Sequence, residues 1–402
     1  MYTIQKYIRN LCLLLLSAIV LAPVYSCSPK DKPEPIVKPE PGDSDEEEGE
    51  DNSEDTFNYV YKENTLGYQV YRIPALIKAK SGKLMAFAEA RKLRSGGDSG
   101  DIDMVVRLSE DNGKTWGNQI MIWDDGTNTC GNPVPIVDEE SGRVHLLLTW
   151  NNGNDTYSEI SNNTGEDTRR VFYTYSDDEG LTWQKPKEIT SNVKNPTWRW
   201  YGTGPVHGVR ISKGAHKGRL VVPAYFNVIE GAQRKDYAHV IYSDDNGDTW
   251  KSGKPTIRDA VGESTIAELN DGNLMINMRP STLNSRLYSI STDGGETWGA
   301  QQTAYSLLDS KCQGSLYAVT TNNIHSLYFS NPASTDRINM TIKKSNDNGQ
   351  SWNSQVLIYA GPSGYSDMVL TKDNHIALLY EGGVSRPYEG IAFHKINLEE
   401  FN

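Results

Sequence analysis

One octapeptide pattern, Ser-x-Asp-x-Gly-x-Thr-Trp, occurs five times in the chain. The copies begin at Ser109, Ser176, Ser243, Ser291 and Ser345. Only Ser351, at the Thr position of the last copy, departs from the pattern. Each copy follows a short β-rich run, and its Asp or Asn and Gly residues are typical of tight turns. The repeat therefore predicts five hairpins, each at the same point of a small sheet.

The stretches between the repeats are β-rich runs such as "YRIPALIKA" and "VHLLLTW", bounded by turn signals. No sustained helical periodicity separates them, so the 402-residue chain is expected to be all-β. Repeat starts lie 67, 67, 48 and 54 residues apart, which suits four-stranded sheets with loops of varying length. The Trp that closes each repeat is expected to pack between neighbouring sheets.

These features predict a six-bladed β-propeller with one repeat at a turn of each of five blades. The sixth blade is expected to come from "YSDMVLTKDNHIALLYEGG" and "GIAFHKINL" near the C-terminus. The first strand, near Phe57, could complete this blade. The repeats would then build the scaffold, and any chemistry would depend on other residues.

The N-terminal part predicts export. Lys6 and Arg9 precede a short apolar run that ends in "VYSC", so residues 1–27 are interpreted as a lipoprotein-type signal peptide with Cys27 as the lipidated residue. Ordinary secretion with cleavage nearby is the alternative. Residues 28–56 form a Pro-rich acidic linker of net charge −9, and residues 57–402 form the propeller. The expected location is the periplasm or cell surface, with membrane contact only through the lipid anchor.

Composition excludes several classes of partner and cofactor. Without the leader and linker the chain has a net charge of only −5 and no basic cluster, so no nucleic acid is expected. Asp244, Asn246 and Asp248 could suggest a Ca²⁺ loop, but the bidentate Glu of an EF-hand is missing, and no metal or other cofactor is predicted. Cys130 and Cys312 are too few for a disulfide scaffold. Their pairing and the oligomeric state stay open.

Three arginines lie within or beside apolar β-rich runs: Arg72, Arg279 and Arg337. Because Arg is rarely buried without a partner, each is expected to meet an anion. Each could pair with a local Asp or Glu at a strand end. Alternatively, all three could converge on one bound carboxylate, which planar guanidinium groups bind through paired hydrogen bonds.

The octapeptide is the Asp box, which is typical of sialidases and also occurs in other propellers. Together with "YRIP", where Tyr71 replaces the commoner Phe, and with Glu263 before Arg279, it makes the chain resemble the exo-α-sialidases. The bacterial members form glycoside hydrolase family 33. The resemblance extends from about Phe57 to the C-terminus. It implies an enzyme that hydrolyses terminal α-linked sialic acids of glycans with retention.

By this resemblance, Arg72, Arg279 and Arg337 hold the substrate carboxylate, and Glu381 braces Arg72. Tyr365 and Glu263 match the nucleophile pair of the family. Sialidases are an exception among retaining glycosidases in using Tyr. A neutral phenol avoids the repulsion that a carboxylate nucleophile would meet at a carbon already bearing a carboxylate.

Asp98, in "RSGGDSGDID", matches the general acid/base, with Asp101 and Asp103 as rivals. Asp101 is expected to be structural, and Asp98 to face the substrate with a raised pKa when the site closes on the sugar. Arg91 is expected to contact the ring near its 4-hydroxyl. Four further tryptophans could line side pockets or pack within blades: Trp123, Trp150, Trp198 and Trp200.

Other functions remain possible. A trans-sialidase or an intramolecular trans-sialidase shares this machinery. A sialic-acid lectin would need the arginines but not Asp98 or the Tyr365 and Glu263 pair. An Asp-box scaffold for protein interactions would not need the arginines.

Overall fold

The computed structural model describes residues 57–94 and 97–401, and the predicted signal peptide and linker lie outside these residues. The described part is almost entirely β, as predicted. Its helices are short: α1 (Tyr157–Asn162), α2 (Thr190–Val193) and the 3₁₀ helix η2 (Leu398–Phe401). In α1 a capping box joins Thr156 and Glu159. The helix is too short to produce a periodic sequence pattern, which is why the sequence did not predict it.

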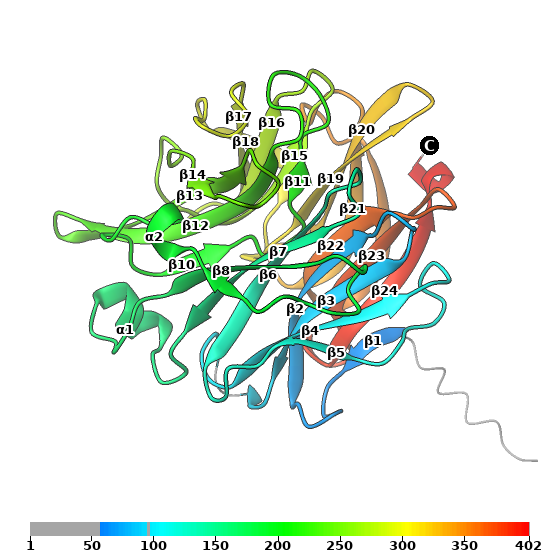
Figure 1. Ribbon diagram of the computed structural model, residues 1–402. Helices are drawn as coiled ribbons and strands as arrows, with labels where there is room; N and C mark the ends of the chain where they lie inside the picture. Colours follow the sequence, from blue (N-terminus) through cyan, green and yellow to red (C-terminus); the bar gives the residue numbers. More distant parts are fainter. Residues whose placement is uncertain (1–56, 95–96, 402) are drawn as a thin grey trace, which may run out of the picture. The chain divides into compact units, whose positions relative to one another are not determined.

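The strands form four sheets, which are antiparallel except for one parallel bridge in the first (Figure 1). The first sheet contains β2 (Val70–Lys78), β3 (Leu84–Arg91), β4 (Ile102–Ser109), β5 (Ile120–Trp123), β6 (Thr129–Val137), β7 (Val144–Asn151), β8 (Arg170–Ser176) and β9 (Lys187–Glu188). The second contains β10 (Tyr201–Thr203), β11 (Val209–Arg210), β12 (Leu220–Glu230), β13 (Gln233–Ser243) and β14 (Lys251–Ser252).

The third sheet contains β15 (Val261–Glu268), β16 (Leu274–Pro280), β17 (Ser285–Ser291) and β18 (Gln302–Leu308). The fourth contains β19 (Ser315–Thr321), β20 (Ile324–Pro332), β21 (Ile338–Ser345), β22 (Ser354–Leu370), β23 (His375–Gly382), β24 (Gly390–Asn397) and β1 (Tyr59–Lys62).

The innermost strands of the sheets contact one another in a closed ring. β2 contacts β6, β6 contacts β11, β11 contacts β15, β15 contacts β19, β19 contacts β22, and β22 contacts β2. This ring of twisted sheets is a β-propeller, as predicted. The number of blades stays a prediction, because β22 pairs with both β21 and β23, and one parallel bridge, Ile102 with Thr129, joins β4 to β6.

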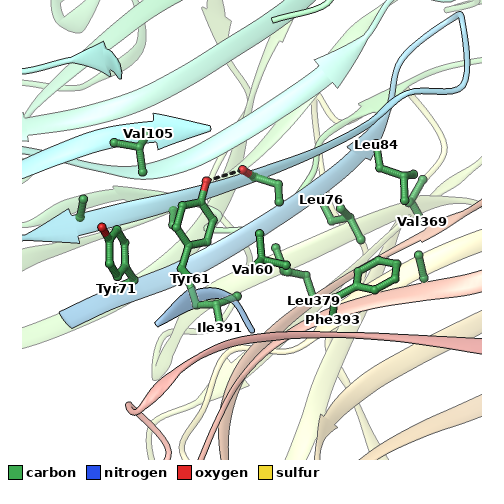
Figure 2. Close-up of a cluster of buried hydrophobic side chains, with 14 of the residues drawn as sticks. Val60, Tyr61, Tyr71, Leu76, Leu84, Val105, Val369, Leu379, Ile391 and Phe393 are labelled. Atoms are coloured by element: carbon green, nitrogen blue, oxygen red, sulfur yellow. Dashed lines mark hydrogen bonds between the residues drawn. The ribbon is translucent and has the colours of Figure 1, made fainter. Parts of the chain in front are cut away.

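The ring closes through β1, which pairs antiparallel with β24. The predicted pairing of the first strand with the C-terminal segment is therefore confirmed. Buried side chains from β1, β2, β3 and β24 fill the space behind this closure (Figure 2). Within this cluster Tyr61 Oη donates a hydrogen bond to the backbone oxygen of Ala86 at 2.8 Å. The two ends of the folded part thus share one core.

Each Asp box forms the predicted hairpin, joining consecutive antiparallel strands. In the third copy, Asp245 Oδ1 accepts hydrogen bonds from Ser243 Oγ at 2.8 Å and from Thr249 N at 2.8 Å. Gly247 N donates to Ser243 Oγ at 2.9 Å, and Gly247 has a φ of 88°. The other four copies repeat these contacts. The Asp side chain therefore organises its own turn.

The Asp-box tryptophans pack between sheet units, also as predicted. Trp116 meets Phe393 of β24 edge-on at 5.4 Å, and Trp183 meets Phe87 of β3 at 5.8 Å. Trp250 packs 5.3 Å from Tyr173 of β8. Each of these rings packs against a strand of the preceding group of strands around the propeller. For Trp116 that strand is β24, at the C-terminal end of the chain.

Cys130 and Cys312 are both buried and free, so the pairing left open by the sequence does not occur. None of the helices in the described ranges is long and apolar enough to cross a membrane. Within those same ranges, no group of three or more His, Cys, Asp or Glu residues is placed to hold a metal ion.

Candidate active site

Tyr365 lies on β22, buried at the centre of the predicted site residues. Its Oη donates a hydrogen bond to Oε1 of Glu263, a buried residue of β15 that is 102 positions away in sequence. Arg279 of β16 donates from Nη1 to Glu263 Oε2 at 2.7 Å and to Tyr365 Oη at 3.4 Å. The order of the strands around the propeller thus brings three predicted residues together, since β15 and β22 both contact β19.

The phenol of Tyr365 is neutral in this environment. Burial raises its pKa well above the usual value of 10.0, and the charge of Glu263 raises it further, whereas Arg279 and Arg337 lower it. The hydrogen bond from the hydroxyl to Glu263 gives the proton a defined acceptor. The pair can therefore generate an oxygen nucleophile without a standing negative charge.

The other two predicted arginines flank the same ring. The guanidinium carbon of Arg72 lies 5.2 Å from the centre of the Tyr365 ring, and that of Arg337 lies 5.6 Å from it. Tyr388 joins them, since Arg72 stacks over its ring at 4.2 Å and Arg337 Nη1 donates to its hydroxyl at 2.5 Å. All three predicted arginines surround Tyr365, so their positive charges meet at one point of the site.

Glu381 of β23 is fully buried and binds both the Arg72 side chain and the backbone beside Tyr365. Its Oε1 accepts hydrogen bonds from Arg72 Nε at 2.8 Å and from the backbone N of Ile73 at 3.0 Å. Its Oε2 accepts from Arg72 Nη2 at 3.1 Å and from the backbone N of Tyr365 at 3.0 Å. One carboxylate thus orients Arg72, offsets its charge and fixes the backbone of Tyr365.

Asp98 faces Arg91. Arg91 Nη2 lies 3.1 Å from Asp98 Oδ1, and the Asp98 side chain is 55% exposed. Arg91 is itself buried, and its Nε donates to Glu89 at 3.0 Å. The structure therefore places Arg91 behind Asp98, with Glu89 as a partner that the sequence did not reveal.

The Asp98 pKa is lowered in this structure, and the increase expected when the site closes on a sugar stays a prediction. Partial loss of solvation raises the pKa, but attraction to Arg91, Arg72 and Arg169 outweighs this effect and lowers the pKa below the usual value. Arg91 is close to Asp98 in the sequence, but Arg72 and Arg169 come from distant positions, so the sequence could not show that all three cations act on this carboxylate. Asp98 is therefore ionised in this arrangement of charges.

Part of this arrangement lines a pocket of about 450 Å³, whereas Arg72, Arg91, Arg337 and Glu381 do not line it. Of the predicted residues, Asp98, Glu263, Arg279 and Tyr365 line it. The other lining residues are Tyr157, Trp200, Tyr225, Asn227, Arg234, Asp236, Gly262, Pro280, Ser281 and Lys311. A charged and aromatic pocket of this volume can hold a small acidic sugar.

The pocket separates Asp98 from its rivals. Neither Asp101 nor Asp103 lines it. Asp103 is fully buried and accepts a hydrogen bond from Tyr68 Oη at 2.6 Å.

Among the four unassigned tryptophans, only Trp200 lines the pocket. Trp198 instead stacks on Phe226 at 3.7 Å, and Trp123 packs against Phe172 at 4.6 Å. Trp150 donates from Nε1 to Asp125 Oδ2 at 2.7 Å. Trp200 itself rests on buried Arg169, whose guanidinium carbon lies 4.0 Å from the ring. Neither Arg169 nor Tyr157, which meets the Trp200 ring edge-on at 4.9 Å, carried a signal in the sequence.

Comparisons with known proteins show to which family the chain belongs. Residues 82–378 match the family model of the BNR repeat-like domain. The chain is 30% identical to the exo-alpha-sialidase of Aspergillus fumigatus over 83% of its own length and 85% of the relative's. The chain belongs to the sialidase family. It is a family of glycoside hydrolases, so this membership classifies the chain as an enzyme.

Other members of the sialidase family give the same result. The chain is 31% identical to a sialidase of Bacteroides fragilis over 82% of its own length, and spans 62% of that protein. Among solved structures, the Hadza microbial sialidase Hz136 matches with a TM-score of 0.75 and 31% identity, covering 84% of this chain and 67% of that one. The intramolecular trans-sialidase of Ruminococcus gnavus, at 19% identity and a TM-score of 0.69, shares the fold.

Proposed function

We propose that the protein is an exo-α-sialidase that removes terminal α-linked sialic acids from glycans with retention of configuration. One observation carries this proposal: the buried Tyr365 hydroxyl donates to Glu263 within a ring of three arginines. A neutral nucleophile surrounded by cations suits a reacting carbon that bears a carboxylate. A lectin would need the cations but not this hydroxyl and its base.

The proposed reaction has two steps. In the first, the arginines bind the sialic acid carboxylate, and Tyr365 Oη attacks the anomeric carbon as its proton passes to Glu263. The bond to the leaving oxygen breaks, and protonated Asp98 supplies a proton to that oxygen. In the second step, Asp98 takes a proton from water, the water oxygen attacks the anomeric carbon, and Tyr365 leaves and recovers its proton from Glu263.

The charge of Asp98 fits this cycle. Its pKa is lowered partly by the positive charge of Arg72. A substrate carboxylate bound to Arg72 offsets that positive charge and raises the Asp98 pKa again. The substrate itself thus favours the protonated acid, and Asp98 returns to the ionised form needed as a base once the leaving group has departed.

The test is incubation of the purified protein with a sialyl-lactose, with the sugar products followed by NMR from the first minutes. Release of free sialic acid as the α-anomer supports retaining hydrolysis. An initial β-anomer would contradict the tyrosyl intermediate. Transfer to added lactose would indicate a trans-sialidase, and a 2,7-anhydro product an intramolecular trans-sialidase. Binding without any product would indicate a lectin.

A further inference from the structure

Tyr365 lies where its strand departs from the sheet. The pairing of β22 with β23 joins Ser363 to Gly382 and Ser366 to Tyr380, and the register shifts between these two pairs. Tyr365 therefore has no partner of its own in the ladder, and its N–H donates to the Glu381 side chain instead. A backbone segment released from a sheet in this way needs other groups to hold it.

Gln313 supplies such a group for the next residue. Its Nε2 donates to the backbone oxygen of Ser366 at 3.0 Å, and its Oε1 accepts from the backbone N of Ser366 at 3.0 Å. Gln313 is only 1% exposed and does not line the pocket. The side-chain amide thus makes the two hydrogen bonds that a neighbouring strand would make.

The residues around Gln313 contact the same short segment. Cys312 packs against Tyr365 in a small buried cluster. Ser315 Oγ donates to Asp367 Oδ1 at 2.7 Å, and Asp367 is fully buried. Three consecutive residues, 365–367, are therefore each held by the stretch 312–315. Because β19 is paired only with β20, this support comes from outside the sheet ladder of β22.

We propose that Gln313 is a positioning residue for the reaction. Its amide fixes the Ser366 peptide and thereby keeps the Tyr365 hydroxyl in line with Glu263. The inference rests on the proposed function, in which Tyr365 is the nucleophile. Because Gln313 is covered by protein, it acts through Tyr365 and not on the substrate. A displacement of about 1 Å at a reacting atom can reduce a rate by up to about 100-fold.

The test compares two Gln→Met variants, which remove amide hydrogen bonds at nearly constant side-chain volume. Gln313→Met removes both bonds to Ser366. Gln301→Met is the matched control, because Gln301 is also buried and its Oε1 accepts from the backbone N of Arg258 at 2.7 Å, away from the pocket. For each variant, kcat and KM are measured on an aryl α-sialoside and on a sialyl-lactose, together with the thermal midpoint.

We expect Gln313→Met to lower kcat by about 10- to 100-fold on both substrates, with KM within about 2-fold of wild type. Gln301→Met should keep kcat within about 2-fold, whatever its thermal midpoint. A folded Gln313→Met with wild-type kcat would overturn the proposal, as would a kcat loss no larger than that of the control. A rise in KM at constant kcat would overturn it too.

Two further measurements keep the result interpretable. If Gln313→Met does not fold, Gln313→Asn, whose shorter side chain withdraws the amide from the Ser366 backbone, is judged by the same criteria with a smaller expected loss of kcat. The wild type is assayed first. An inactive wild type would contradict the proposed function and this inference with it, whereas an active wild type with an unaffected variant contradicts the positioning role alone.

Discussion

Replacement of Glu381 by Gln should damage both stability and activity, because this carboxylate holds Arg72 and Tyr365 together. Both oxygens of Glu381 accept two hydrogen bonds, from Arg72 on one side and from backbone N–H groups on the other. An amide at this position turns one acceptor into a donor that faces other donors. It also leaves the Arg72 guanidinium without its buried counter-charge.

The size of the effect follows from these contacts. Breaking one partner of a buried ion pair costs about 3–5 kcal/mol. An unfolding entropy of about 2.1 cal/mol/K per residue amounts to ~0.7 kcal/mol/K for a folded part of this length. The thermal midpoint should therefore fall by roughly 4–7 °C. Loss of an oriented Arg72 should remove about 1.5–3 kcal/mol of transition-state binding, or ~10- to 150-fold in kcat/KM.

The assay combines thermal unfolding with kcat/KM on an aryl α-sialoside at 25 °C. Asp138→Asn is the matched control, since Asp138 is a buried carboxylate paired with Arg210 at 3.0 Å and lies outside the pocket. It should lower the midpoint and leave kcat/KM within about 2-fold. A Glu381→Gln variant that loses stability but keeps full kcat/KM would refute the reasoning, because Arg72 and Tyr365 would then need no bracing.

Three other perturbations test separate parts of the structure. Asp98→Ala should reduce hydrolysis of a sialyl-galactoside by about 10²- to 10⁴-fold and an activated aryl sialoside much less, because a phenolate leaves without protonation; Tyr365→Phe should depress both substrates evenly. Equal losses for Asp98→Ala would point to another acid. Burial lowers the pKa of His239 to about 3, so as the pH falls the unfolded chain is protonated at this residue before the folded chain, and stability falls as the pH drops from 6.5 towards 3. His239→Gln should therefore show a smaller drop in thermal midpoint between pH 7 and pH 5. An unchanged drop would contradict the assignment of this pH dependence to His239. Cys27→Ser should move the protein from the membrane fraction to the soluble fraction with activity intact, and retention in the membrane would exclude lipidation at this residue.

Much of the fold could be predicted because its signals are local. Every hydrogen bond that defines an Asp-box turn joins residues no more than four positions apart, as between Asp245 and Thr249. Such a turn forms wherever the octapeptide occurs, so its recurrence predicted the hairpins and, with the closing Trp, the packing of similar units. The short helix α1 was missed, because its only local signal is the Thr156 and Glu159 capping box.

For the candidate site, the sequence predicted several residues but not the side chains that they contact. The resemblance to the sialidases selected Arg72, Glu263, Tyr365 and Glu381 by residue type within motifs. It could not give the partners that these side chains meet. Tyr388, Glu89 and Arg169 stand in no motif, and each becomes visible only as a neighbour of a predicted residue.

The sequence by itself determined the β-rich units, their turns and the types of residue available for chemistry, because these depend on interactions between residues close in the chain. Only the tertiary structure decided which of those residues meet. Arg72 and Glu381 are 309 positions apart, and they form an ion pair because β1 and β24 close the ring and bring β2 beside β22 and β23. The charge of Asp98 was decided in the same way, since electrostatic interactions depend on distance in space and the cations that lower its pKa come from separate strands and loops.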